Sequence, residues 1–235
     1  MPERFTYLAV LLGCGIVPFL FSFHPKLRFY RHWKAFFFAA VPVLLFFVIW
    51  DVLFVRLGVW RFNPRYVTGI EIAQLPLEEI LFFLVIPYCS VFTLHSFDVL
   101  LPDRRMRISV SRTVVIVLAV LLVVIASVFI RHLYTSVTFL LLAAFLLWLS
   151  QKKAEALPRY LLTWAVILLP FFLSNGILTG SFLQEPVVIY NDAQNLGVRL
   201  FTIPFEDVFY GMLLLLLNFS AYDWWKSREV VPAGL

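Results

Sequence analysis

Long apolar stretches recur along this chain, and their length decides what it can fold into. Seven of them are nearly free of charged side chains, at residues 5–23, 35–55, 75–97, 112–130, 134–150, 159–177 and 203–221. A helix of about 20 apolar residues crosses the ~30 Å hydrocarbon core of a bilayer. With 62% hydrophobic and 14% charged residues, the chain has lipid as its natural surroundings. The sequence therefore predicts an all-α integral membrane protein with about seven transmembrane helices.

The distribution of basic residues orients these spans. Of the 19 lysines and arginines, thirteen fall in alternate segments on one side of the predicted membrane, within 24–34, 104–112, 152–159 and 226–228. Because cytoplasmic loops are enriched in Lys and Arg, we expect the N-terminus outside and the C-terminus in the cytoplasm. The membrane we expect is a bacterial cytoplasmic membrane. The net charge of +5 then reflects topology and contact with anionic lipid, and it does not indicate nucleic-acid binding.

An internal repeat organises the chain. VTGIEIAQLPLEEI at 67–80 aligns without gaps on NLGVRLFTIPFEDV at 195–208, so Glu78 corresponds to Glu206 and Glu79 to Asp207, 128 positions apart (206 − 78 = 128). Three spans per repeat and one linking span give both copies the same orientation in the membrane. We expect a first repeat at 1–100, a linker helix at 101–133 and a second repeat at 134–235, with both acidic pairs starting a helix at the non-cytoplasmic face and converging on one cavity.

The acidic pairs admit a structural and a functional interpretation. Pro76 and Pro204 suit the first turn of a helix, where an acid two or three positions later faces the positive end of the helix dipole. Adjacent helical residues point about 100° apart, however, so two consecutive acids cannot both face the same headgroup water. Ionisable groups at membrane depth are costly and are functional by default. Repetition at matching positions favours the functional interpretation.

Neighbouring carboxyl groups in an apolar setting can divide two roles between them. Burial and a second negative charge favour the protonated form of a carboxyl group, whereas a helix N-terminus opposes it. One partner then holds a proton while the other stays ionised. In a pocket walled by aromatic rings, of which the chain has many (26 Phe), this suits protonation of an alkene and cation–π stabilisation of the carbocation formed. No GxSxG nucleophile or metal-ligand spacing of histidines suggests hydrolysis.

Three further polar residues are supporting candidates. Asp51 follows a long apolar run and either supports the first acidic pair or lies at the interface near Arg56. Asn175 either plays the matching part in the second repeat or simply ends the sixth span. Arg199 stands where the first repeat has Glu71, and it either holds one acid ionised or is a rim arginine in a loop.

These residues carry a resemblance to a known family. WDVLFVRLGVWRFNP, LPLEEILFF, NGILTG and IPFEDVFYG resemble the two halves of the small membrane lycopene cyclases that lack a flavin domain. The mark of that family is a PxE[ED] motif in each half, matched here at residues 76–79 and 204–207. The family occurs as two subunits, as a fused chain and as the cyclase half of fungal bifunctional carotenoid enzymes; this chain is similar to the fused form.

The resemblance implies an enzyme that converts lycopene, or a related linear carotenoid, to β-carotene through monocyclic γ-carotene. It implies Glu78, Glu79, Glu206 and Asp207 as acid–base carboxylates, without deciding which one donates the proton. The implied reaction is an isomerisation, so we expect no redox cofactor and no metal. One or two ring closures, β or ε rings, C40 or longer substrates, and association into homo-oligomers all stay open.

Other classes of membrane protein fit less well. A retinal photoreceptor needs a lysine in its last span, and none of the five lysines lies within 203–221. A membrane prenyltransferase needs aspartate-rich repeats to hold Mg²⁺ and diphosphate, and Asp192 has no further spaced aspartates. A proton-coupled transporter or a non-catalytic carotenoid-binding protein remains the alternative, because repeats and intramembrane acids also mark carriers.

Overall fold

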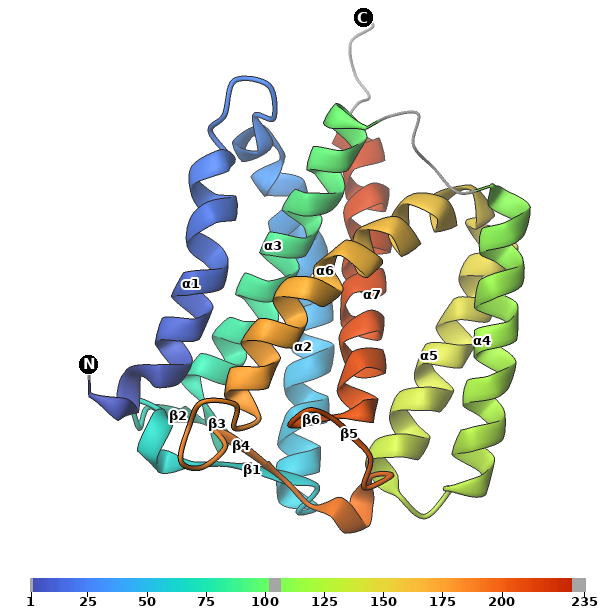
Figure 1. The fold of residues 1–235 in the computed structure, drawn as a ribbon. Helices are drawn as coiled ribbons and strands as arrows, with labels where there is room; N and C mark the ends of the chain where they lie inside the picture. The colour runs from blue at the N-terminus through green and yellow to red at the C-terminus, as the bar shows by residue number, and fades with distance from the viewer. Residues whose placement is uncertain (1, 102–106, 230–235) are drawn as a thin grey trace, which may run out of the picture. The chain divides into compact units, whose positions relative to one another are not determined.

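The computed structural model describes residues 2–101 and 107–229 as helices joined by short loops and small hairpins (Figure 1). The α-helices in this part are α1 (Thr6–Phe21), α2 (Trp33–Arg56), α3 (Leu77–Leu100), α4 (Ile108–Val128), α5 (Leu133–Lys152), α6 (Leu157–Leu178) and α7 (Phe205–Glu229). Short 3-10 turns are η1 (Glu3–Phe5), η2 (Phe29–His32), η3 (Pro64–Tyr66), η4 (Ala154–Ala156) and η5 (Asp192–Gln194). The strands are β1 (Trp60–Phe62), β2 (Glu71–Ile72), β3 (Leu75–Pro76), β4 (Val188–Tyr190), β5 (Arg199–Leu200) and β6 (Ile203–Pro204).

Most of these helices match a membrane span in length and apolarity. Within the described residues, six stretches meet both conditions, and they contain α1 to α6. The seventh, α7, is 25 residues long, but it opens on Glu206 and Asp207 and ends on Lys226 and Arg228, so it is less apolar on average. Many large apolar side chains of the spans are turned outward, such as Leu169 at 80% exposure, as expected for a surface that meets lipid. The all-helical membrane fold predicted from the sequence is confirmed.

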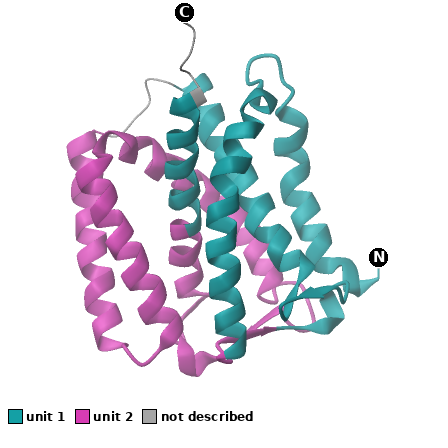
Figure 2. Cartoon of the chain, turned by 180° about the vertical axis from the view of Figure 1, so that it is seen from behind, with its two compact units in different colours: residues 1–56, 62–102, 214–235 teal, residues 57–61, 103–213 magenta. Residues whose placement is uncertain are grey.

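The chain divides into two compact units that do not follow the chain order (Figure 2). Unit 1 comprises residues 1–56, 62–102 and 214–235, and unit 2 comprises 57–61 and 103–213. The helix α7 therefore begins in unit 2 and ends in unit 1.

Arg104 and Arg105, which contribute to the predicted charge asymmetry, lie outside the described residues.

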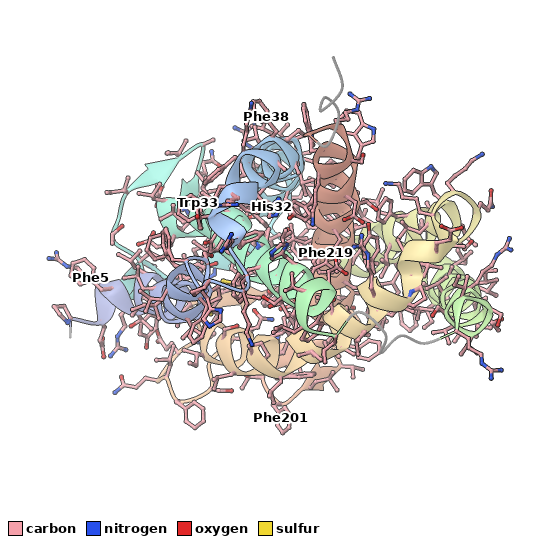
Figure 3. The ribbon with its side chains drawn as sticks, turned by 90° about the horizontal axis from the view of Figure 1, so that it is seen from above. Phe5, His32, Trp33, Phe38, Phe201 and Phe219 are labelled. Atoms are coloured by element: carbon pink, nitrogen blue, oxygen red, sulfur yellow. The ribbon has the colours of Figure 1, made fainter. Side chains whose placement is uncertain are left out.

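In unit 1, α3 packs against α1 and α2. Aromatic contacts fill this packing: the ring of Phe47 on α2 lies 5.6 Å from that of Phe83 on α3. Phe29 meets Tyr222 of α7 at 6.3 Å between ring centroids. Phe38, half exposed on α2, stacks on Trp225 of α7 at 5.0 Å and is labelled in Figure 3.

In unit 2, α4 packs closely along α5 and also contacts α6. Small residues on α4 allow the close approach, since Ala119 and Ala126 are fully buried. The ring of Phe139 on α5 lies 5.1 Å from that of Phe209 near the start of α7. These contacts fix the first turns of α7 against α5.

The same loop structure precedes α3 and α7. In unit 1, the Asn63 side chain accepts a hydrogen bond from the Arg65 N–H and so starts η3; in unit 2, Asn191 accepts from the Ala193 N–H and starts η5. A two-residue hairpin follows in each copy, with β2 paired antiparallel to β3 and β5 to β6. The registers are equivalent, because Glu71 opposite Pro76 becomes Arg199 opposite Pro204 at the 128-residue offset.

The prolines of the two motifs lie immediately before their helices, whereas the sequence indicated that they lie in the first helical turn. Pro76 ends β3 and is the N-cap of α3, with an extended backbone (ψ 144°), instead of lying in the first turn. Pro204 likewise ends β6 immediately before α7. A proline without an N–H is tolerated at the end of a short edge strand, and its fixed φ directs the chain into the helix. The acids still fall in the first turn of each helix.

Glycines at equivalent positions set the bend into each hairpin. Gly69 has φ 88° and Gly197 has φ 68°, in the left-handed region that other residues enter only at a cost. A Cβ at either position would meet no atom within 4 Å, so the restriction is one of backbone conformation alone.

Gly69→Ala and Gly197→Ala are each expected to lower the free energy of unfolding by about 1–2 kcal/mol, because L-residues are strained at positive φ. Thermal denaturation of the purified protein in detergent measures this. Gly13→Ala is the matched control: Gly13 is helical, a Cβ there also meets nothing within 4 Å, and alanine favours the helix. Equal behaviour of all three variants would contradict the backbone argument.

Candidate functional site

All four acids of the two motifs are buried. The exposed fraction is 1% for Glu78, 8% for Glu79, 0% for Glu206 and 5% for Asp207. An acid that merely complements the helix dipole at a headgroup surface would be largely exposed, and all four of these are buried. Burial of adjacent carboxyl groups in an apolar chain costs several kcal/mol unless hydrogen bonds compensate. The neighbours of each acid therefore decide what the site can do.

The first acid of each pair is held by a backbone N–H ten residues earlier. Glu78 Oε1 accepts a hydrogen bond from the Thr68 N–H at 2.7 Å. Glu206 Oε1 accepts one from the Leu196 N–H, also at 2.7 Å, and a second from Thr135 Oγ1 at 2.5 Å. In both residues the other oxygen, Oε2, is buried and has no hydrogen-bond partner among the described residues.

The second acid of each pair accepts a hydrogen bond from a tyrosine. Tyr7, the second residue of α1, donates its hydroxyl to Glu79 Oε2 at 2.5 Å within unit 1. Tyr134, the second residue of α5, donates to Asp207 Oδ1 at 2.5 Å within unit 2. Both tyrosines are almost completely buried, at 1% and 2% exposure. In each repeat, then, a tyrosine at the start of the first helix donates a hydrogen bond to the second acid.

Asp207 accepts hydrogen bonds from three side chains. Besides Tyr134, Asn175 Nδ2 donates to its Oδ2 at 2.8 Å and the Tyr190 hydroxyl donates to the same oxygen at 2.9 Å. Three donors on one carboxylate stabilise its charged form.

Aromatic rings gather around the hydroxyl donors of Asp207 in unit 2. The ring of Trp60 lies 5.1 Å from that of Tyr134 and 5.9 Å from that of Tyr190, and the two tyrosines stack at 5.8 Å. Tyr210 adds a fourth ring, 6.2 Å from Trp60. We call these four residues the aromatic cluster. The electron-rich faces of such rings attract cations.

Two of the three supporting candidates, Asn175 and Asp51, are half-buried and buried, respectively. Asn175 contacts Asp207 directly. Asp51 is 2% exposed in α2 beside Trp50, which is 5% exposed, so it occupies a buried position in unit 1.

Arg199 has the contacts of a rim arginine. Its guanidinium pairs with Asp192 at 2.7 Å and donates to the Thr202 carbonyl at 2.9 Å, while its side chain is partly exposed. Neither acid of the second pair is among the partners of Arg199 in the described contacts. Phe201 beside it, at the hairpin tip, is 89% exposed and points away from the protein (Figure 3).

The sequence reasoning missed the residues that donate to the acids. Tyr7 and Tyr134 are 127 positions apart (134 − 7 = 127), and a search of the repeat beyond the motifs would have paired them. Thr135 and Tyr190 have no such signal, because the first repeat has Leu8 after Tyr7 and Phe62 at the position 128 residues before Tyr190. The two backbone donors carry no residue signature at all.

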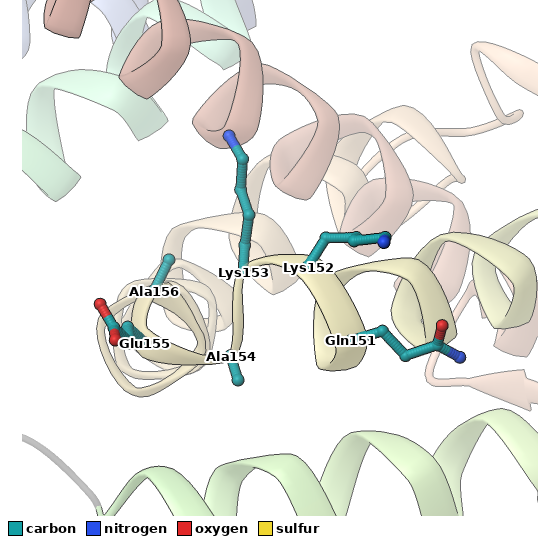
Figure 4. A pocket seen from close by; sticks show the side chains of 6 residues that line it. All are labelled: Gln151, Lys152, Lys153, Ala154, Glu155 and Ala156. Atoms are coloured by element: carbon teal, nitrogen blue, oxygen red, sulfur yellow. The ribbon is translucent and has the colours of Figure 1, made fainter.

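A shallow depression of about 470 Å³ lies apart from the acids, at the turn between α5 and α6 (Figure 4). It is lined by six consecutive residues, Gln151 to Ala156, including Lys152 and Lys153. Its open, charged lining does not suit an apolar polyene.

The family model described as Lycopene cyclase matches residues 4–97 and again residues 131–225. These two segments cover most of the chain, each contains one acidic pair with its hairpin, and the helix α4 falls between them. The chain belongs to the lycopene cyclase family. It is therefore a membrane enzyme of carotenoid biosynthesis that acts on a carotenoid substrate. No curated protein and no solved structure matches it.

Thr135→Val is expected to destabilise the protein by about 0.5–1.5 kcal/mol, because Glu206 loses one buried hydrogen bond while the shape of the replaced side chain is kept. Thr138→Val is the matched control, since Thr138 is equally buried on α5 and its hydroxyl has no hydrogen-bond partner in the described part of the chain. Denaturation in detergent compares the two. A loss for Thr138→Val as large as that for Thr135→Val would show that the hydrogen bond to Glu206 is not the cause.

Proposed function

We propose that this protein is a lycopene β-cyclase, an intramolecular lyase that closes the acyclic end groups of lycopene to give β-carotene through γ-carotene. The observation that carries the proposal is the set of four buried carboxyl groups in a chain of the lycopene cyclase family. They form two pairs, and each pair has the same arrangement of a backbone N–H on the first acid and a tyrosine hydroxyl on the second. Glu78, Glu79, Glu206 and Asp207 serve as the acid–base groups.

Each ring closure is an isomerisation. A carboxylic acid transfers its proton to C2 of the end group, and the electron pair of the C1–C2 double bond forms the new C–H bond, leaving a cation at C1. The C5–C6 double bond then forms the C1–C6 bond and moves the cation to C5. A carboxylate removes the C6 proton, and the released pair forms the ring double bond. Protons and electrons balance without an oxidant or reductant, so the reaction demands no redox cofactor.

Two features of the site suit this chemistry. Buried carboxyl groups are needed because water would capture the carbocation, and apolar packing around the acids excludes it. The aromatic cluster of unit 2 offers ring faces beside Asp207 for cation–π stabilisation. In unit 1, Phe47 stacks on Trp50 at 5.6 Å, next to buried Asp51.

Glu78→Gln and Glu206→Gln, made separately, are expected to reduce ring closure by about 100-fold or more, because each removes a general acid–base group. The measurement is expression in a lycopene-accumulating bacterial host, followed by pigment extraction and chromatography. Glu71→Gln is the control, since Glu71 is exposed on β2. The unmodified chain should yield β-carotene. Lycopene that copurifies with the protein but stays acyclic would instead support a carotenoid-binding protein.

We also propose that the chain lies in a bacterial cytoplasmic membrane with its N-terminus outside and its C-terminus in the cytoplasm, in accordance with the excess of Lys and Arg in alternate loops. A green fluorescent protein fused to the C-terminus should fluoresce, and alkaline phosphatase fused there should be inactive, since the former folds in the cytoplasm and the latter requires the periplasm. The reverse pattern would contradict this orientation.

A further inference from the structure

The two acids of each pair differ in a way that both repeats share. Glu78 and Glu206 each have one oxygen held by a backbone N–H and one buried oxygen without a partner. Glu79 and Asp207 have no such oxygen within the described part of the chain, and each accepts a tyrosine hydroxyl. The same contrast between first and second acid occurs in both repeats, although different residues surround the two pairs. It is therefore a property of the site and not of one loop.

The unpartnered oxygen suits a proton donor. A charged oxygen buried without a hydrogen-bond donor is costly, whereas a neutral O–H at the same place is much less so. An apolar polyene seated against Oε2 brings no donor and excludes water, which further favours the neutral form. The π electrons of an alkene can accept the proton directly, and no acceptor among the residues that the structure describes competes for it.

The tyrosine-bound carboxyl suits the opposite role. A phenol O–H donates to a carboxylate oxygen and so stabilises the charged form, most clearly at Asp207 with its three donors. A carboxylate held in this way is ready to accept a proton.

We propose that in each repeat the first acid, Glu78 or Glu206, donates the proton to C2 from Oε2, and that the second, Glu79 or Asp207, accepts the proton lost from C6. Tyr7 and Tyr134 are positioning residues that keep the second acid ionised and oriented. After one ring closure the first acid is ionised and the second is protonated; once the product has left, the second acid loses its proton to solvent and the first acid takes one up, which restores the starting state. This division of roles rests on the proposed cyclase function.

The test separates protonation of the substrate from removal of the C6 proton. Wild type and two paired variants, Glu78→Gln/Glu206→Gln and Glu79→Gln/Asp207→Asn, are reconstituted in liposomes with lycopene in D₂O. Mass spectrometry measures deuterium in the ring products and in the recovered lycopene. Pairing the changes removes the same role from both repeats at once.

Wild type should place deuterium in the ring and little in the recovered lycopene. The donor variant should form no ring and leave lycopene unlabelled, because the cation never forms. The acceptor variant should form at least ten-fold less β-ring yet return labelled lycopene, because the cation forms and reverts, and rings closed by loss of a C4 proton should increase. Label in lycopene from the donor variant, or none from the acceptor variant, would overturn the assignment.

The tyrosines provide a second measurement if the acidic variants do not fold. Tyr7→Phe/Tyr134→Phe keeps every acid and should raise the ratio of labelled lycopene to β-ring several-fold, a readout that a purely structural role would not move. Tyr88→Phe is the matched control, since its hydroxyl contacts Ser22 and Trp33 and not an acid. An unchanged ratio in the paired tyrosine variant would refute the positioning role. Absence of rings from wild type would instead refute the cyclase function itself.

Discussion

Carboxyl groups buried in an apolar chain must find hydrogen-bond donors, and this requirement shapes the site. The donors come from the loop before the helix and from the start of another helix. The bend at Gly69 follows Thr68, whose N–H meets Glu78, and Gly197 follows Leu196, whose N–H meets Glu206. The small hairpins then return the chain to the helix start, so that local backbone geometry places an acid and its donor together.

Both repeats keep this loop and hairpin before the acidic helix, while the surrounding residues differ. Both copies have the asparagine that starts the 3-10 turn, the same hairpin register and a tyrosine on the second acid. In the second copy, Thr135 donates to the first acid, and Asn175 and Tyr190 donate to the second acid. The hairpin tips differ as well, because the first has Ala73 and Gln74 at positive φ where the second has only Phe201. The asparagine, the hairpin register and the tyrosine that both copies share point to shared chemistry.

Much of the fold could be read from the sequence, because apolar runs of membrane length and an ungapped repeat are strong, local signals. The acids could be found for the same reason. Their donors could not: a backbone N–H has no residue identity, and Tyr7 meets Glu79 across 72 positions of chain. For Arg199 the repeat left two roles open, one beside the acids and one at the rim, and its described partners are exposed Asp192 and the Thr202 carbonyl. The predicted convergence of both acidic pairs on one cavity remains a prediction.

The main-chain anchor of the first acid has a consequence for how such proteins change over generations. Side-chain replacement cannot delete an amide N–H, with proline as the exception, so the residue that supplies it is free to drift. The two copies already show this, with threonine at 68 and leucine at 196 performing the same task. Selection there acts on the path of the loop, and homologous loops with little identity can retain the same anchor.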